Sequence, residues 1–466
     1  MARPFTTVRS HLSPEMCRFS NCELALKTLS NATRAHAYGR PISRRPTPHV
    51  RVGYAHGLSG GLHEHYKPYM DKQFHAAADA WWLQYAREMM KRMGTFFDQE
   101  AAEDFSNRSG DQGAGRMDPN AAKTAAEASD AELWDFLCDP NSMIAPRRGE
   151  YLPDVRLQEL EDDGLAGEVI FPQMAPFGAG LMQYRHSITP EHSLAGNRAY
   201  NHWLADLCKQ NPGRHAGVAV INVDDIEVSV REVREAHAMG LFGGVLLPTS
   251  TGPHPYYHDY QHYAPLWAAC EELNMPIHTH SGWSPDYGDL PSATPMYISE
   301  VDMWAQRPFK ALLWSGVFER HPNIKLVFTE TGCGWILEML RVLDFKIDNP
   351  IFAHFTKELS LTPREYFQRN CYIGASFLPR HEVGSRHAIG IDKLMWGSDY
   401  PHMEGTWPNT LNKLRETFHD VPEAEIRSML GETAIDVFGF DRAQMEAAAA
   451  RIGLDISSIR QAPEAA

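Results

Sequence analysis

From residue 165 onward, short apolar runs alternate with amphipathic stretches. The runs are rich in Val, Ile, Leu and aromatic residues and are bounded by Gly, Pro, Asp or Ser, which is typical of buried parallel strands. They are Glu168–Phe171, Gly217–Ile221, Gly243–Leu247, Pro276–His280, Lys325–Thr329, Cys371–Gly374 and Leu394–Gly397. Helices are predicted at Leu194–Gln210, Val228–Met239, Tyr263–Leu273, Trp335–Ile347 and Thr406–Phe418. Seven strand-then-helix units predict a parallel sheet, and one more strand would close a (β/α)8 barrel.

The first strand of such a barrel has one weak candidate, Val50–His56. Residues 68–105 carry apolar side chains at helix spacing, whereas 106–150 begin polar and aperiodic and then become helical around Ala131–Cys138. Within Pro422–Ile452 the pattern predicts two short helices, separated by a turn at Gly439 and packed on the barrel wall. We therefore expect an α/β fold, a (β/α)8 TIM barrel with an insertion after the first strand and a C-terminal helical extension.

The net charge of the chain changes near residue 60. The 466 residues include 44 Lys and Arg and 59 Asp and Glu, hence −15. Residues 1–60 hold nine of the basic and two of the acidic side chains, hence +7, which leaves −22 for the remainder. We predict an atypical basic leader at 1–60, a barrel domain at 61–442 with its insertion at 106–150, and a C-terminal helix and tail at 443–466. For the leader, an incorrect start or reading frame is favoured over a transit peptide or a disordered tail.

Composition also limits the partners and the location. The seven cysteines are odd in number and widely spaced, with no C-x-x-C, which predicts reduced thiols and a cytoplasmic protein. The negative charge disfavours nucleic acid, and no apolar run approaches the ~20 residues of a membrane-spanning helix. We expect a small-molecule substrate, with homodimer formation left open.

Polar side chains follow three of the predicted strands. His280 ends one run, Glu330 follows the next, and Asp399 and His402 follow the last. Carboxyl ends of barrel strands share one mouth, and imidazole and carboxylate are ligands for zinc or manganese. His278 and His280 share a strand face because side chains alternate, and His280 is nearer the mouth. A lone His in a strand is usually a core residue and a lone Asp a turn cap, but three such strand ends favour a metal site.

The motifs at these strand ends carry a family likeness. MPIHTHSG, HPNIKLVFTETGCGWILEMLRVLD, NCYIGASF and LMWGSDYPHMEGTWPNT together resemble the amidohydrolase-related superfamily. More narrowly, they resemble the branch of 2-amino-3-carboxymuconate semialdehyde decarboxylase and related aromatic-acid decarboxylases. The resemblance spans residues 151–442. It implies that His280 is a metal ligand and that Asp399 touches the metal and handles the proton.

The resemblance also shows two departures. The decarboxylases place a His after strand six, where this sequence has Glu330, and a carboxylate differs from imidazole in charge and pKa. The family takes two metal ligands from strand one; in Tyr54-Ala55-His56 the resemblance implies His56 as the second, but Tyr54 stands at the first position and is not expected to bind a metal. His63-Glu64-His65 has the same spacing but follows no apolar run, so a helix start is favoured there.

These observations favour an enzyme that is a metal-dependent hydrolase acting on a small, carboxylated or cyclic substrate. One divalent ion, zinc in preference to manganese, would be held by His56, His280 and Asp399 and would activate a water molecule. Asp399 would be the general base, Glu330 would hold the water or orient a ligand, and His402 would donate to the substrate or to a carboxylate. The alternatives are a metal-dependent decarboxylase of an aromatic or muconate-type acid, and a non-catalytic barrel without strand-one ligands.

Overall fold

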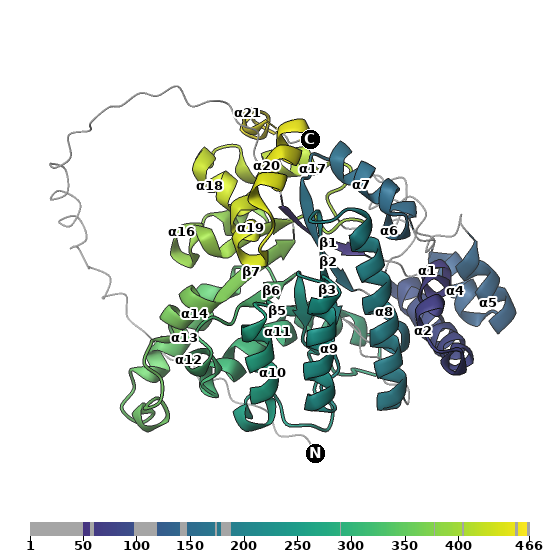
Figure 1. The fold of residues 1–466 in the computed structure, drawn as a ribbon, viewed down its shortest axis with the longest axis horizontal. Coiled ribbons are helices and arrows are strands. Elements are labelled where there is room, and N and C mark those ends of the chain that lie inside the picture. The colour runs from purple at the N-terminus through teal and green to yellow at the C-terminus, as the bar shows by residue number, and fades with distance from the viewer. Residues whose placement is uncertain are drawn as a thin grey trace, which may run out of the picture. The chain divides into compact units, whose positions relative to one another are not determined.

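The computed structural model describes residues 50–55, 60–96, 119–139, 147–172, 175–178, 188–288, 290–376, 378–402, 405–452 and 455–463. Eight parallel strands form a closed barrel in sequence order, shown at the centre of Figure 1. They are β1 (Val50–Ala55), β2 (Gly167–Pro172), β3 (His215–Val220), β4 (Gly244–Leu246), β5 (Ile277–His280), β6 (Leu326–Thr329), β7 (Cys371–Ser376) and β8 (Leu394–Gly397). The predicted TIM barrel and all eight predicted strands are confirmed.

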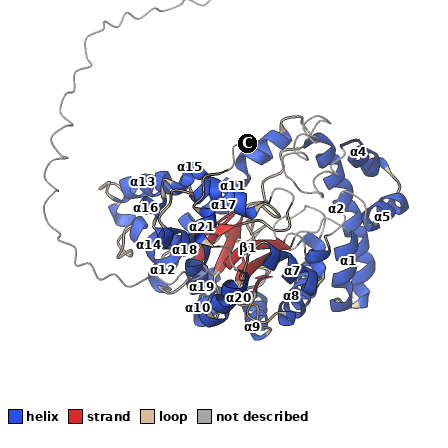
Figure 2. Ribbon diagram, turned by 90° about the horizontal axis from the view of Figure 1, so that it is seen from above, coloured by secondary structure: helices blue, strands red, loops and turns tan. Residues whose placement is uncertain are grey.

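Helices surround the strands, as the view in Figure 2 shows. Those that follow β2 to β8 are α8 (Pro190–Gln210), α9 (Ile226–Ala238), α10 (Tyr260–Glu272), α11 (Ala293–Trp314), α12 (Val317–Arg320), α13 (Trp335–Ile347), α14 (Pro363–Asn370), α15 (Arg380–Val383), α16 (Arg386–Ile389) and α17 (Thr410–Phe418). Their apolar faces join the outer side of the barrel in one core cluster. Within the described residues, no helix combines the length and the apolarity needed to cross a membrane.

The described residues between β1 and β2 are mostly helical. It contains α1 (Gly60–Tyr66), α2 (His75–Phe96), α4 (Pro119–Glu127), α5 (Asp130–Cys138), α6 (Arg148–Tyr151) and α7 (Pro153–Asp162). Arg87 on α2 donates hydrogen bonds to the carbonyls of Ala126 (2.8 Å) and Ala128 (2.6 Å), which would otherwise lack a partner at the end of α4. A capping box of Ser129 and Glu132 then starts α5. This helical pair agrees with the predicted insertion, of which residues 106–118 and 140–146 lie outside the described residues.

The interior of the barrel is filled with apolar side chains and closed at its amino-terminal end by the last helices. The closing helices are α19 (Thr433–Phe438) and α20 (Arg442–Ile452), whereas the buried side chains of α18 (Glu423–Arg427), the π-helical η7 (Ser428–Glu432) and α21 (Ile456–Ile459) belong to the cluster outside the strands. Phe438 and Met445 belong to the same buried cluster as Val169 on β2 and Met395 on β8. Between α19 and α20 the chain turns at Gly439, whose φ of +78° is free of steric strain only for glycine.

Two predicted boundaries differ from this arrangement. Strand β1 begins at Val50 and pairs with β2 and, through Val52 and Gly397, with β8, so the barrel starts inside the segment 1–60 that we assigned to a leader. The residues of that segment before Val50 lie outside the described residues. The boundary at 442 cuts α20, whose Met445 and Ala449 are buried in the barrel cluster. The helix therefore closes the barrel instead of packing on its wall, because its buried side chains join those that point inward from the strands.

Candidate metal and catalytic site

The two histidines of β5 occupy different depths of the barrel. His278 and His280 both contact the ring of Phe171, at centroid distances of 4.9 and 5.4 Å, so they share the inward face as predicted. The Nε2 of His278 donates to the Gly243 carbonyl at 2.8 Å and its ring stacks on Phe438. Burial lowers the pKa of His278 to about 4, so this residue is a neutral core histidine. His280 is the member of the pair that lies at the carboxyl end of the strand.

Glu330 faces His280 from the end of β6. Its Oε2 lies 3.6 Å from His280 Nε2 and accepts a hydrogen bond from the Ser281 hydroxyl at 3.2 Å. The Ser376 hydroxyl donates to its Oε1 at 3.5 Å. The backbone of Glu330 has a φ of +55°, a conformation that costs a non-glycine residue on the order of 1 kcal/mol or more. The turn that this conformation makes directs the carboxylate toward its neighbouring strands.

Asp399 and His402 form a hydrogen-bonded pair after β8. His402 Nδ1 lies 2.8 Å from Asp399 Oδ2, and the His402 amide donates to the Asp399 carbonyl at 2.7 Å. Asp399 is fully buried and, like Glu330, has a positive φ, of +58°. The turn closes with the Thr406 amide donating to the Ser398 carbonyl at 2.8 Å. Glu330 and Asp399 thus both have positive φ, at the ends of β6 and β8 on either side of β7, and such conformations cluster at functional sites.

These residues bring metal-ligand chemistry together at one end of the barrel. One ligand atom each from Glu330, Asp399 and His402 lie within 4.8 Å of one another, and Glu330 is in turn next to His280. Two imidazoles and two carboxylates are a donor set that fits a divalent ion such as zinc or manganese. The structure thus gathers His280, Glu330, Asp399 and His402. The fifth predicted site residue, His56, lies outside the described residues.

The alternative ligand pair His63 and His65 is not part of this group. Both residues lie on α1, as the helix prediction for this segment requires. His63 Nε2 contacts Asp79 at 2.8 Å, and Lys67 Nζ binds the same carboxylate at 2.7 Å. His65 stacks instead on the ring of Tyr151 at 4.6 Å. A lysine ammonium beside Asp79 makes this cluster an ion-pair network and disfavours a cation there.

Two residues that were not predicted, Arg147 and Glu150, lie at the end of the insertion, and Glu150 is close enough to His402 to interact with it electrostatically. Glu150 on α6 is buried and accepts a hydrogen bond from the Arg147 amide at 2.8 Å. Burial raises the pKa of Glu150 to about 8, against the opposing effects of Arg147, Arg156 and His402. The Arg147 guanidinium lies over the Trp407 ring at 5.1 Å. Only the helix-start pattern around Glu150 is visible in the sequence, and it carries no signal of burial.

Replacing Glu150 with Gln is expected to stabilise the protein at neutral and alkaline pH. A carboxyl with a pKa of about 8 in the folded chain and 4.5 in the unfolded chain must be protonated on folding between these values. Its contribution to stability is present below pH 4.5 and is lost, by up to about 1.4 kcal/mol per pH unit, as the pH rises to 8. Because other buried groups such as Glu232 also titrate in this range, the prediction concerns the difference: between pH 5 and 8, urea unfolding should show a steeper loss of stability with pH in the parent than in Glu150→Gln. The exposed Glu127→Gln on α4 is the control, and equal slopes in all three proteins would contradict the prediction.

Comparison with known proteins agrees with the resemblance read from the motifs. The amidohydrolase family model matches residues 167–440. The gamma-resorcylate decarboxylase of Polaromonas sp. is 24% identical over 229 residues, covering 44% of this chain and 65% of that protein, which is just under two thirds of its length. The gamma-resorcylate decarboxylase of Rhodococcus jostii is 27% identical over 315 residues, covering 62% and 88%. A 2-amino-3-carboxymuconate-6-semialdehyde decarboxylase of Dictyostelium discoideum is 23% identical over 304 residues, covering 62% and 77%.

A solved structure has the same fold. The manganese-bound 5-carboxyvanillate decarboxylase of Novosphingobium aromaticivorans aligns with a TM-score of 0.52 and 17% identity, over 73% of this chain and 94% of that chain. The predicted resemblance is confirmed by the family match, and the predicted class of hydrolase or carboxy-lyase agrees with the curated relatives. Among the sequence-based alternatives, these relatives favour the decarboxylase over the hydrolase.

Proposed function

Because the chain belongs to the amidohydrolase family, we propose that it is a metal-dependent decarboxylase of a small aromatic or muconate-type acid. The observation that carries this proposal is the convergence of His280, Glu330, Asp399 and His402 at the strand ends of a barrel whose curated relatives are decarboxylases. It replaces the hydrolase that the sequence alone favoured. A cytoplasmic location and a homodimer stay parts of the proposal, to be tested by fractionation and light scattering.

In this proposal His280 and Asp399 hold the ion, with His56 as a further ligand. The bound ion would supply positive charge that attracts the substrate carboxylate and a neighbouring oxygen. Zinc and manganese both suit the donor set, and elemental analysis of protein purified without chelator decides between them. Well under one ion per chain would instead support the non-catalytic barrel.

The Asp399–His402 pair handles the proton. In decarboxylation the bond between the substrate carbon and its carboxylate breaks, CO2 leaves, and the electron pair stays on the carbon, which then takes a proton. The 2.8 Å contact between His402 Nδ1 and Asp399 Oδ2 allows one proton to be held between the two groups and delivered to that carbon. Solvent then returns a proton to the pair. Trp407, edge-on to Tyr400 at 5.6 Å, provides an aromatic surface beside this turn.

The decarboxylase proposal is tested by following the carboxyl carbon. Protein loaded with zinc or with manganese is incubated with carboxyl-labelled 2,6-dihydroxybenzoate and 5-carboxyvanillate, and labelled CO2 is measured. Release of CO2 that is lost with chelator and restored by the metal is the expected result. If a parallel panel of cyclic amides and lactones is hydrolysed while no acid on test releases CO2, the decarboxylase proposal is wrong and the hydrolase is correct.

One feature favours the hydrolase as the second candidate. Glu330 is a carboxylate held by two serine hydroxyls beside His280, an arrangement able to orient an attacking water. Glu330→Gln is therefore expected to separate the two chemistries. Loss of a water-orienting base should reduce hydrolysis by about 10²-fold or more, whereas decarboxylation should change by less than about 10-fold. The measurement is the initial rate of CO2 release from the test acids and of hydrolysis of the test amides and lactones, with Glu338→Gln, which replaces an exposed carboxylate on α13, as control.

A further inference from the structure

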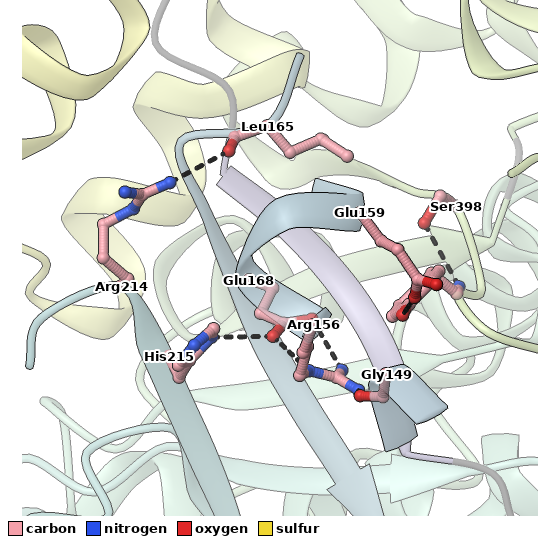
Figure 3. A network of polar contacts seen from close by, with 9 residues as sticks. Gly149, Arg156, Glu159, Leu165, Glu168, Arg214, His215 and Ser398 are labelled. Carbon is pink, nitrogen blue, oxygen red and sulfur yellow. Dashed lines mark hydrogen bonds and ion pairs between the residues drawn. The ribbon is translucent and has the colours of Figure 1, made fainter. Parts of the chain in front are cut away.

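A buried charged network lies beside the barrel, on the side covered by α7 (Figure 3). Arg156 on α7 forms a two-pronged ion pair with Glu168 on β2, with Nε–Oε1 and Nη2–Oε2 distances of 2.6 and 2.7 Å. His215 Nδ1 on β3 lies 2.7 Å from the same Oε1. The side chains of all three residues are fully buried. Taking charges out of water is costly, and a buried ion pair is weak evidence for a role in stability.

The same guanidinium contacts two segments that belong to the candidate site. Its Nη1 donates to the Gly149 carbonyl at 3.2 Å, one residue before the buried Glu150. Its Cζ lies 5.1 Å from the centre of the Tyr400 ring, and Tyr400 directly follows Asp399. One turn further along α7, Glu159 accepts a hydrogen bond from the Tyr400 hydroxyl. Helix α7 therefore holds the residue after Asp399 by its ring and by its hydroxyl.

These contacts of α7 with Tyr400 lie next to Asp399, whose backbone has a positive φ. The φ of +58° at Asp399 lies in the left-handed region, where the Cβ of any non-glycine residue is crowded, although Asp adopts it more readily than most. Contacts of the surrounding structure help to hold such a conformation. Tyr400 is fully buried, and Trp407 contacts its ring from another side. Planar guanidinium stacks on an aromatic ring in a way that a lysine ammonium does not reproduce. Arg156 thus connects the barrel wall at Glu168 to the turn that carries Asp399 and His402.

We propose that Arg156 is a positioning residue for the metal and proton chemistry, acting through Tyr400 on the Asp399–His402 turn and through Gly149 on the Glu150 segment. The inference rests on the proposed function in one respect, namely that Asp399 is a metal ligand. Groups that orient metal ligands contribute about 10- to 100-fold to metal affinity in other proteins. Arg156 would do so without touching either the metal or the substrate.

The test uses a variant that removes the charges without leaving one of them unpaired. Arg156→Met combined with Glu168→Gln keeps similar volumes and lets His215 donate to the new amide oxygen. The matched control is Arg214→Met. Arg214 is also nearly buried and is paired with Glu161 at 3.0 Å, and among the described residues it has no hydrogen bond, ion pair or ring contact with Gly149 or Tyr400. Both proteins are first checked for cooperative unfolding.

Two readouts are taken, neither of which depends on turnover. Manganese binding, measured by the loss of its free-ion electron paramagnetic resonance signal, should weaken about 10-fold or more in the paired variant and less than about twofold in Arg214→Met. Hydrogen exchange of the His402 and Thr406 amides, both of which donate within the Asp399 turn, should accelerate in the paired variant alone. Unchanged metal affinity and unchanged exchange in a folded paired variant would overturn the proposal.

Two further proteins keep the inference testable. If the paired variant does not fold, Tyr400→Phe, which keeps the ring over Arg156, should retain more metal affinity than Tyr400→Leu, and equal losses would overturn the proposal. If the parent chain binds no metal, the proposed function fails, and the exchange of the His402 and Thr406 amides alone decides on the positioning role. The two failures are therefore distinguishable.

Discussion

Asp399→Asn is expected to lower turnover by about 10³-fold or more while the barrel stays folded. Asparagine has nearly the same shape, so the fully buried turn can keep its packing. It cannot accept and return a proton, and it is a weaker metal ligand than a carboxylate. The loss should therefore appear in kcat and in the affinity for manganese. The first is measured by steady-state kinetics on a test acid that the parent protein decarboxylates, and the second by metal titration.

The matched control for this change is Asp392→Asn, which alters an exposed carboxylate two residues before β8. Asp392 pairs only with its neighbour Lys393, at 3.0 Å, among the ion pairs of the described residues. Its replacement should leave turnover and metal affinity within about twofold. Full activity in Asp399→Asn, with circular dichroism unchanged, would remove Asp399 from the proposed mechanism.

Arg156→Met alone should destabilise the protein by about 3–5 kcal/mol, the largest loss of stability that we expect from a single substitution. Removal of the guanidinium leaves the Glu168 carboxylate buried beside His215 with no compensating permanent charge. Adding Glu168→Gln should recover most of the loss, because no ionised group then stays behind. Urea unfolding of the four proteins of this cycle measures the coupling between the two side chains.

The stability difference between the parent and Arg156→Met should also depend on pH, in a direction that follows from the pKa of Glu168. Burial raises the pKa of Glu168, but the charge of Arg156 and the hydrogen bond from His215 outweigh it and lower the pKa to about 2. Since the unfolded value is 4.5, the pair stabilises the parent above that pH, and the stabilisation is lost as the pH falls from 4.5 toward 2. Without Arg156, burial should dominate and Glu168 should bind a proton. The stability difference between parent and Arg156→Met should therefore shrink as the solution is acidified, and a constant difference would contradict the account.

The barrel could be predicted because most of its strands can be recognised from their own residues and those directly beside them. Runs such as Leu394–Gly397 are apolar on both faces and are followed by polar residues, here Ser398 and Asp399. The position of the strand, its end and the residue at the mouth of the barrel can therefore be inferred from a short stretch of sequence. The weak point was β1, since VRVGYA is interrupted by Arg51 and Gly53 and follows a basic segment without helix or strand periodicity. Its assignment depends on pairing with β2 and β8, which are more than 100 residues away.

The candidate site likewise contains residues that the local sequence reveals and residues that only tertiary packing reveals. His280, Glu330, Asp399 and His402 are each visible as a strand-end residue. Glu150 and Arg156 are not, because a charged residue in a helical segment usually faces solvent, and only tertiary packing reveals that these are buried. The choice between hydrolysis and decarboxylation followed a single residue, Glu330, and the curated relatives favour the other alternative. One side chain carries little weight against similarity along most of the barrel.

The closure of the barrel by its last helices sets the order in which the protein can be completed during synthesis. Strand β1 needs β8 as its second neighbour, and the barrel interior is covered at its amino-terminal end by Phe438 and Met445. A ribosome-bound chain that has just released β7 thus has an open sheet edge and a solvent-exposed apolar interior for some 70 further residues. At roughly 5–20 residues per second, this interval lasts several seconds. Burial of the interior therefore waits for α19 and α20, which leave the ribosome after all eight strands.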